Sequence, residues 1–204
     1  MTAPPLPGGP LDGAAVLALY EGAGALRRGH FVLSSGGHSD TYLQSALVLQ
    51  WPAVAEALGR ALVEPWRGRV DVVVGPAMGG LMIGHEAARA LGVRMVFTER
   101  VGGRMALRRS LEVRPGERAL VTEDVVTTGG SALEVADLLR AGGAGVTALA
   151  AIVDRTPAGT RFPVPFSALA RVGAGAWEPA ECPICRSGSE PESPGSRRLA
   201  DRTK

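Results

Sequence analysis

The chain contains few residues of several types, and each shortage excludes a class of protein. Two cysteines in 204 residues are too few for a disulfide framework. Aromatic residues make up only 4% of the chain, which leaves few side chains on which nucleic-acid bases could stack. Lysine occurs once, at Lys204, and the formal net charge of +2 is small. We therefore expect no nucleic-acid partner.

Long hydrophobic runs are also missing, because no stretch approaches the ~20 apolar residues of a membrane span. The first ten residues, "MTAPPLPGGP", have neither the basic nor the apolar region of a signal peptide. We expect residues 1–10 to form a disordered leader, no membrane partner, and a cytoplasmic protein. The length suits one domain with a single core.

Short apolar runs alternate with helical patterns through the middle of the chain. Four runs have this character: "VDVVVGPAMGG", "VRMVFTER", "ERALVTEDVVTTGG" and "VTALAAIVDRTPAG". Fully apolar strands that alternate with helices predict an α/β fold, with a parallel sheet flanked by helices on both faces. Upstream, the spacing predicts a helix over 12–28 with Asp12 as its N-cap, a hairpin around "SSGG", and a helix over 51–66.

Each of the four apolar strands ends in polar or glycine-rich chemistry. In parallel sheets, ligands bind at the carboxyl ends of the strands, so these four ends should share one site. The third end, "TEDVVTTGGS", places Glu123 and Asp124 before a loop of small and hydroxylated residues that opens a helix. Backbone N–H groups at such a helix start bind phosphate, and carboxylates accept hydrogen bonds from sugar hydroxyls. The ligand inferred from these residues is a ribose 5-phosphate.

The stretch "ALVTEDVVTTGGSA" resembles the phosphoribosyl pyrophosphate (PRPP) signature of the type I phosphoribosyltransferases. Three further stretches resemble parts of the orotate phosphoribosyltransferases: "GALRRGHFVLSSGGHSDTYLQ" their N-terminal hood, "GPAMGG" their pyrophosphate loop, and "VDRTPAG" the segment that holds the orotate carboxylate. The resemblance covers residues 12–172. It implies a phosphoribosyltransferase domain over 11–172 with a hood at 11–50, followed by a weakly ordered Pro/Ser/Arg-rich tail at 173–204.

The family's roles are carried over position by position. The resemblance implies transfer of the phosphoribosyl group of PRPP to orotate, giving orotidine 5-monophosphate and pyrophosphate in UMP biosynthesis. Residues implied to bind PRPP are Arg27, Ala77, Met78, Gly79, Arg100, Glu123, Asp124, Val125, Val126, Thr127, Thr128, Gly129, Gly130 and Ser131. Residues implied to bind orotate are Tyr42, Thr128 and Arg155. Residues implied to be catalytic are Arg100, Arg104, Arg108 and Asp124.

The resemblance also implies Mg²⁺ as cofactor, carried mainly by the substrate with no dedicated protein ligands. It further implies a homodimer in which a mobile, arginine-rich loop reaches the neighbouring subunit's site, with Gly102 and Gly103 giving it freedom to close. Residues 99–118 carry six arginines against three glutamates, which suits a polyanionic substrate. A solvated charged loop is the alternative explanation.

Two alternative functions remain open at this point. A purine-base phosphoribosyltransferase stays possible because Gly37 stands where the family often has an arginine that contacts the base. A PRPP-sensing regulator without catalysis would keep the same ligand site. Gly79 is a second departure, since some relatives have a lysine there.

The cysteines occur as Cys182-Pro-Ile-Cys185. Alone, the pair is half a zinc site. It could be completed by a second subunit or form a reducible disulfide, but free thiols are favoured. His30 and His38 are interpreted as surface or packing residues of the hairpin rather than as catalytic groups.

Overall fold

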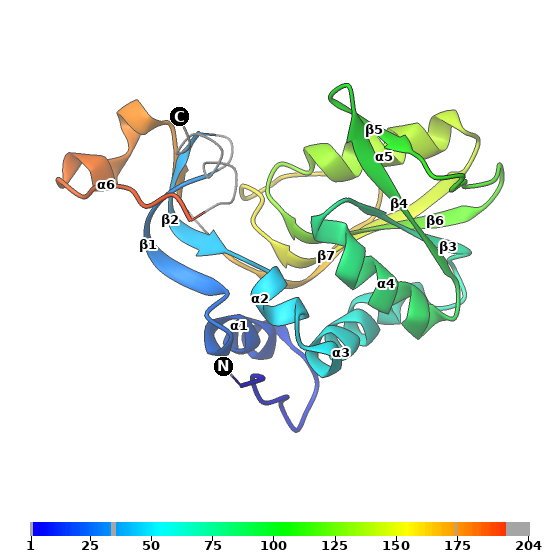
Figure 1. Cartoon of the computed structure of the whole chain (residues 1–204), viewed down its shortest axis with the longest axis horizontal. Helices are drawn as coiled ribbons and strands as arrows, with labels where there is room; N and C mark the ends of the chain where they lie inside the picture. Colours follow the sequence, from blue (N-terminus) through cyan, green and yellow to red (C-terminus); the bar gives the residue numbers. More distant parts are fainter. Residues whose placement is uncertain (1, 34–35, 174, 195–204) are drawn as a thin grey trace.

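A computed structural model describes residues 2–33, 36–173 and 175–194 of the chain as two sheets with flanking helices (Figure 1). The larger sheet has the strand order β5-β4-β3-β6-β7-β8, and the smaller has the order β1-β2-β9. Within the described residues, no helix is long and apolar enough to span a bilayer. The strands of the larger sheet are β3 (Val72–Pro76), β4 (Arg94–Val101), β5 (Arg104–Leu107), β6 (Arg118–Val126), β7 (Gly145–Asp154) and β8 (Phe166–Arg171).

The larger sheet is parallel except at its β5 edge, and helices cover both of its faces. On one side lie α3 (Pro52–Val63) and α4 (Gly79–Leu91); on the other lies α5 (Gly130–Ala141) (Figure 1). Successive side chains of β3 pack on opposite faces of the sheet: Val73 belongs to the core beneath α3 and α4, and Val74 to the core beneath α5. The predicted fold class is confirmed.

The N-terminal helix is shorter than its sequence pattern predicts. Asp12 caps α1 (Gly13–Gly22) by accepting a 2.9 Å hydrogen bond from the Ala15 amide, as expected. The chain then leaves the helix, and residues 26–28 belong to β1 instead. Pairing with β2 therefore overrides the helical periodicity of this stretch. Residues 2–10 contain no helix or strand, although Pro4 is buried.

The smaller sheet, which we call the hood, is a hairpin completed by the C-terminal segment. It consists of β1 (Leu26–Val32), β2 (His38–Leu43) and β9 (Ala176–Trp177). Further along, the Glu192 amide donates to the His30 carbonyl at 2.7 Å, and its carbonyl accepts from the Val32 amide at 2.8 Å. The expectation of a weakly ordered tail is wrong for residues 175–194, because backbone hydrogen bonds join them to the hood. Residues 195–204 lie outside the described residues.

The remaining short elements join the hood to the large sheet or belong to the C-terminal segment. They are α2 (Ala46–Leu49), the 3₁₀ turn η1 (Glu64–Trp66), the 3₁₀ turn η2 (Pro179–Glu181) and α6 (Pro183–Arg186).

The first part of the arginine-rich segment, through residue 107, is a β-hairpin, whereas the resemblance implies a mobile loop. Strands β4 and β5 pair in antiparallel fashion from Thr98–Leu107 to Val101–Arg104. Gly102 and Gly103 have φ values of 56° and 82°, the positive values that a two-residue hairpin turn needs. The two glycines therefore form the turn of a hairpin, and their role in loop closure stays a prediction.

Candidate active site

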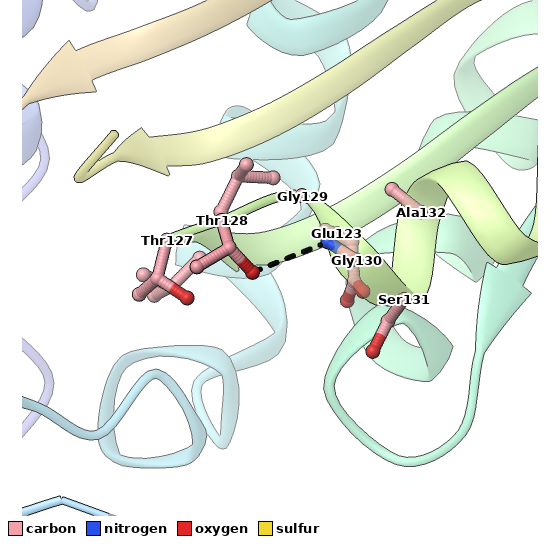
Figure 2. Close-up of a pocket in the computed structure, with 9 residues that line it drawn as sticks. Glu123, Thr127, Thr128, Gly129, Gly130, Ser131 and Ala132 are labelled. Carbon is pink, nitrogen blue, oxygen red and sulfur yellow. Dashed lines mark hydrogen bonds between the residues drawn. The ribbon is translucent and has the colours of Figure 1, made fainter. Parts of the chain in front are cut away.

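A pocket, which we call the phosphate pocket after its predicted ligand, forms where β6 meets α5 (Figure 2). Gly129 precedes the helix with a φ of 78°, and a Cβ at this position would overlap the ring of Phe162. The Gly130 amide points back toward Thr128 and lies 3.4 Å from its Oγ1 (Figure 2). Free N–H groups at the start of α5, together with glycine's lack of a side chain, suit a bound phosphate. The pocket is lined by Glu123, Val125, Val126, Thr127, Thr128, Gly129, Gly130, Ser131 and Ala132.

The two adjacent acids leave β6 on opposite sides of the strand, as neighbouring strand residues do. Glu123 lines the phosphate pocket, whereas Asp124 faces Gly79 at the start of α4. Burial raises the pKa of Glu123 to about 8, and the nearby Asp124 charge adds to this shift. Burial likewise raises the pKa of Asp124. Both carboxyls are therefore suited to hydroxyl donors or to a cation that arrives with a ligand.

Asp124 is positioned by a residue that the sequence did not indicate. The buried Ser45 accepts a 3.0 Å hydrogen bond from the Tyr20 hydroxyl, and its own side chain hydrogen-bonds Asp124. This hydrogen bond favours the charged form of Asp124 and so opposes the effect of burial on its pKa. A serine immediately before a short helix gives no sequence signal for this role.

Glycines allow the start of α4 to approach β6 closely. A Cβ on Gly79 would overlap Asp124 Oδ1, and one on Gly80 would lie 2.6 Å from the Thr122 carbonyl oxygen. The loop before the helix contains a cis peptide bond between Ala77 and Met78, and the Met78 side chain is exposed. The predicted pyrophosphate loop thus lies directly beside the predicted ribose acid. A lysine in place of Gly79 would displace Asp124.

Arg155 follows β7 and connects the large sheet to the hood. Its Nη2 donates to Ser39 Oγ at 3.0 Å and to the Thr41 carbonyl at 3.2 Å. Its buried Nε has no hydrogen-bond partner among the described residues, and burial lowers the pKa of its guanidinium. A buried donor without a partner is costly, and an anionic ligand would satisfy it.

The turn that carries Arg155 is fixed by a buried carboxylate. Asp154 accepts from the Thr156 amide at 2.7 Å and pairs with Arg171 of β8 at 2.6 Å. Arg171 also donates to the Thr156 carbonyl at 2.8 Å. The sequence placed Asp154 at a strand end but did not identify Arg171 as its partner, because β8 was not predicted.

Of the loop arginines, the structure brings Arg100 to the pocket. Arg100 Nη1 donates to Glu134 of α5 at 3.0 Å, and its Nη2 lies 3.4 Å from Ser131 Oγ. The side chain of Arg104 at the hairpin turn is exposed and makes no hydrogen bond or ion pair with the described residues. Arg108 is exposed too; the hydrogen bond from Arg109 lowers the pKa of Glu99, and the charge of Arg108 adds a smaller contribution. Neither Arg104 nor Arg108 contacts a residue that lines the pocket within the described part.

Two predicted ligand residues of the hood are engaged elsewhere. Arg27 forms a two-pronged ion pair with Glu192, at 3.0 and 2.6 Å, and its guanidinium lies 5.3 Å from the centre of the Phe31 ring. Tyr42 packs against the same ring at 5.7 Å and accepts a 3.3 Å hydrogen bond from Gln44. Arg27 and Tyr42 therefore have structural partners in the hood, and their ligand roles stay predictions.

The cysteine pair is not left as isolated thiols. Both cysteines lie against the two histidines of the hood, His30 and His38. A pair of histidines flanking a hairpin turn and a distant CxxC were each visible in the sequence, but their proximity was not.

Comparisons with known proteins agree with this geometry. The family model described as "Phosphoribosyl transferase domain" matches residues 45–163. The chain is 47% identical to an orotate phosphoribosyltransferase of Caldanaerobacter subterraneus over 90% of this chain and 97% of that protein. It is 50% identical to one of Heliobacterium modesticaldum over 89% and 97%.

Solved structures show the same fold. The crystal structure of the Aeropyrum pernix orotate phosphoribosyltransferase is similar with a TM-score of 0.64 and 28% identity, covering 76% of this chain and 92% of that one. An adenine phosphoribosyltransferase of Rhodothermus marinus is similar in fold alone, with a TM-score of 0.60 and 22% identity, covering 78% and 99%.

Proposed function

Since the chain belongs to the orotate phosphoribosyltransferase family, we propose that it transfers the phosphoribosyl group of PRPP to orotate. The products are orotidine 5-monophosphate and pyrophosphate, within cytoplasmic UMP synthesis. The observation that carries the proposal is the arrangement at the carboxyl edge of the large sheet. There, the phosphate pocket, the two buried acids and the unpartnered Nε of Arg155 lie at the ends of adjacent strands.

PRPP binding follows from the chemistry of β6 and α5. The 5-phosphate accepts hydrogen bonds from the amides at the start of α5, and Arg100 adds positive charge beside Ser131. Glu123 and Asp124 accept hydrogen bonds from the ribose hydroxyls. The pyrophosphate lies over the loop at Ala77–Met78, next to Asp124.

Orotate binding is assigned to Arg155 beneath the hood. Its guanidinium offers a planar fork of N–H donors that matches a carboxylate. Ser39 and the Thr41 carbonyl hold one end of this fork in place, which leaves the Nε donor for the ligand. This pre-positioning reduces the ordering cost when orotate binds.

The reaction needs no nucleophilic side chain, because a ring nitrogen of orotate attacks the anomeric carbon of the ribose as the bond to pyrophosphate breaks. The protein contributes orientation and electrostatic stabilisation of the developing charges. We assign the catalytic charge to Arg100, Arg104 and Arg108, and the ribose contact to Asp124. The side chain of Arg104 is exposed and forms no ion pair or hydrogen bond within the described residues. We therefore propose that it acts in the site of a second copy in a homodimer.

Mg²⁺ is proposed as the cofactor. The two acids fit a hard cation, because carboxylate oxygens are its preferred ligands and because burial, which raises the pKa of both Glu123 and Asp124, favours a cation that arrives with a ligand. When bound, the ion supplies positive charge to the leaving pyrophosphate. It is expected to bind mainly through PRPP, without a dedicated set of protein ligands.

The test is the loss of orotate absorbance with PRPP and Mg²⁺ each withheld in turn. Loss only when both are present supports the proposal and the cofactor. Turnover of adenine, guanine or hypoxanthine in place of orotate would overturn it in favour of a purine-base enzyme. PRPP binding by calorimetry without turnover of any base would indicate a regulator.

A further inference from the structure

Two cysteines and two histidines from distant parts of the chain meet between the hood and α6, which lie side by side in Figure 1. His30 is on β1 and His38 is on β2. Cys182 immediately precedes α6, and Cys185 lies within it. One atom from each residue contributes to the cluster, and the four atoms all lie within 4.8 Å of one another. This cluster is separate from the phosphate pocket, since the two share no residue.

The spacing of the four atoms is that of ligands around one ion. His30 Nε2 lies 3.0 Å from His38 Nδ1 and 3.4 Å from Cys182 Sγ, while Cys185 Sγ lies 3.2 Å from His38 Nδ1. In a tetrahedral zinc site with bonds of about 2.0–2.3 Å, neighbouring ligand atoms are roughly 3.3–3.8 Å apart. Small shifts of the side chains would therefore accommodate an ion at the centre.

The hydrogen bonding of His30 presents the correct nitrogen to the cluster. Its Nδ1 lies 3.0 Å from the Ser189 carbonyl oxygen, which can only accept a hydrogen bond. Nδ1 must then carry the proton, and Nε2 directs its lone pair toward the cysteines. Metal-binding histidines are commonly oriented by such a second hydrogen bond.

We propose that His30, His38, Cys182 and Cys185 bind one Zn²⁺ ion. Two thiolates and two imidazoles form a ligand set that binds Zn²⁺ in preference to Mg²⁺ or Ca²⁺. Cys182 is fully buried, and the two histidines are 7% and 8% exposed. Four protein ligands leave no position for a reacting water, so the ion is structural rather than catalytic.

The ion would cross-link the C-terminal segment to the hood. A small hairpin sheet is marginally stable by itself, and metal binding contributes directly to the stability of such elements. Ser39, which follows the ligand His38, accepts the hydrogen bond from Arg155. Zinc would therefore hold in place the strand that positions Arg155, although zinc binding itself does not depend on the proposed orotate activity.

The first experiment measures the metal content of the full chain, purified without a polyhistidine tag, by inductively coupled plasma mass spectrometry. We expect about one zinc ion per chain. Cys182→Ser and Cys185→Ser should each lose most of the zinc. His85→Ala is the matched control, because His85 is an exposed histidine of α4 outside the cluster, and it should retain the ion.

A second experiment needs no variant and so does not depend on whether the variants fold. Modification of the wild-type thiols with a mercurial should release zinc in step with the loss of two thiols, as detected by a metal-binding dye. Exchange with Co²⁺ should give the strong visible bands of a tetrahedral site and a near-ultraviolet thiolate-to-cobalt band. Wild-type protein that neither contains zinc nor takes up Co²⁺ in this way would overturn the proposal. So would an intact mass two hydrogens short, which indicates a Cys182–Cys185 disulfide.

Discussion

At the scale of single residues, the adjacent acids Glu123 and Asp124 have different surroundings. Glu123 opens onto the phosphate pocket, whereas Asp124 is held between Ser45 and the start of α4. The sequence placed two adjacent acids at this point, and their role in binding a ligand stays a prediction. It could not indicate Ser45, because that contact depends on how α2 packs near β6.

The raised pKa of Glu123 predicts how stability depends on pH without substrate. Glutamate titrates near 4.5 when unperturbed but at about 8 here, so between these values the folded state keeps a proton that the unfolded state releases. Stability therefore falls as pH rises from about 4.5 to about 8. Glu123→Gln should reduce the loss in Tm between pH 5 and pH 8 by at least about 3 °C. An equal loss in both proteins, measured by calorimetry, would contradict the assignment.

Arg155→Ala should raise the KM for orotate roughly 10- to 100-fold, because a charge-assisted hydrogen bond from its Nε is worth about 1.5–3 kcal/mol. The KM for PRPP should change much less. Arg60→Ala, at an exposed position on α3, is the matched control for loss of one positive charge. Initial rates over a grid of both substrates separate the two KM values. Equal increases in both would contradict a specific orotate contact.

At the scale of elements, the position of α4 depends on the lack of side chains at its start. The N-terminus of this helix approaches β6 so closely that a Cβ at Gly79 would overlap the carboxyl group of Asp124. The sequence marked "GPAMGG" as a ligand loop. The reason for its glycine pair, Gly79 and Gly80, is this approach of helix to strand, which only the three-dimensional packing reveals.

Gly79→Ala should lower kcat/KM by at least about tenfold, because the new methyl group displaces Asp124 or the start of α4, and shifts of about 1 Å in a site are costly. Gly145→Ala is the matched control, since a Cβ there lies 3.8 Å from the Glu117 carbonyl oxygen. Steady-state kinetics, with circular dichroism to verify folding, checks the result. Unchanged kcat/KM in the folded variant would show that the contact does not position Asp124.

Three of the four large-sheet strands that the sequence predicted share one property: their residues are mostly apolar on both faces. β3, β6 and β7 lie inside the sheet, so burial on both faces fixes their pattern. β5 and β9 gave no such signal. β5 is a short edge strand, and β9 is a two-residue strand that exists through its pairing with β2.

At the scale of the whole molecule, the proposed dimer makes a prediction about mixed subunits. Arg104→Ala removes the exposed hairpin charge, and Thr128→Asp places a carboxylate where the 5-phosphate should bind. Each variant alone should be nearly inactive. If Arg104 acts across the interface, mixed dimers contain one intact site in two, and a random mixture should recover about a quarter of wild-type activity. Verified heterodimers without recovery would show that Arg104 acts within its own subunit.

Contacts between distant parts of the chain account for most of what the sequence did not predict. The loop between β6 and α5 is a continuous stretch of chain, so the sequence alone could single out its residues, and phosphate stays their predicted ligand. The cluster of two histidines and two cysteines joins residues 30 and 38 to residues 182 and 185, and Arg27 forms an ion pair with Glu192. Neither association follows from local periodicity, because each depends on how the C-terminal segment returns to the hood.

The return of the C-terminal segment to the hood also orders events during protein synthesis. The ribosome releases β1 and β2 early, yet their third strand and their backbone partner at Glu192 are made after every strand of the large sheet. Because domains fold as the chain emerges, the large sheet can assemble while the hood hairpin still lacks its partners. The hood is therefore expected to be the last part of the enzyme to mature, and the nascent chain to acquire its phosphate pocket before its orotate site.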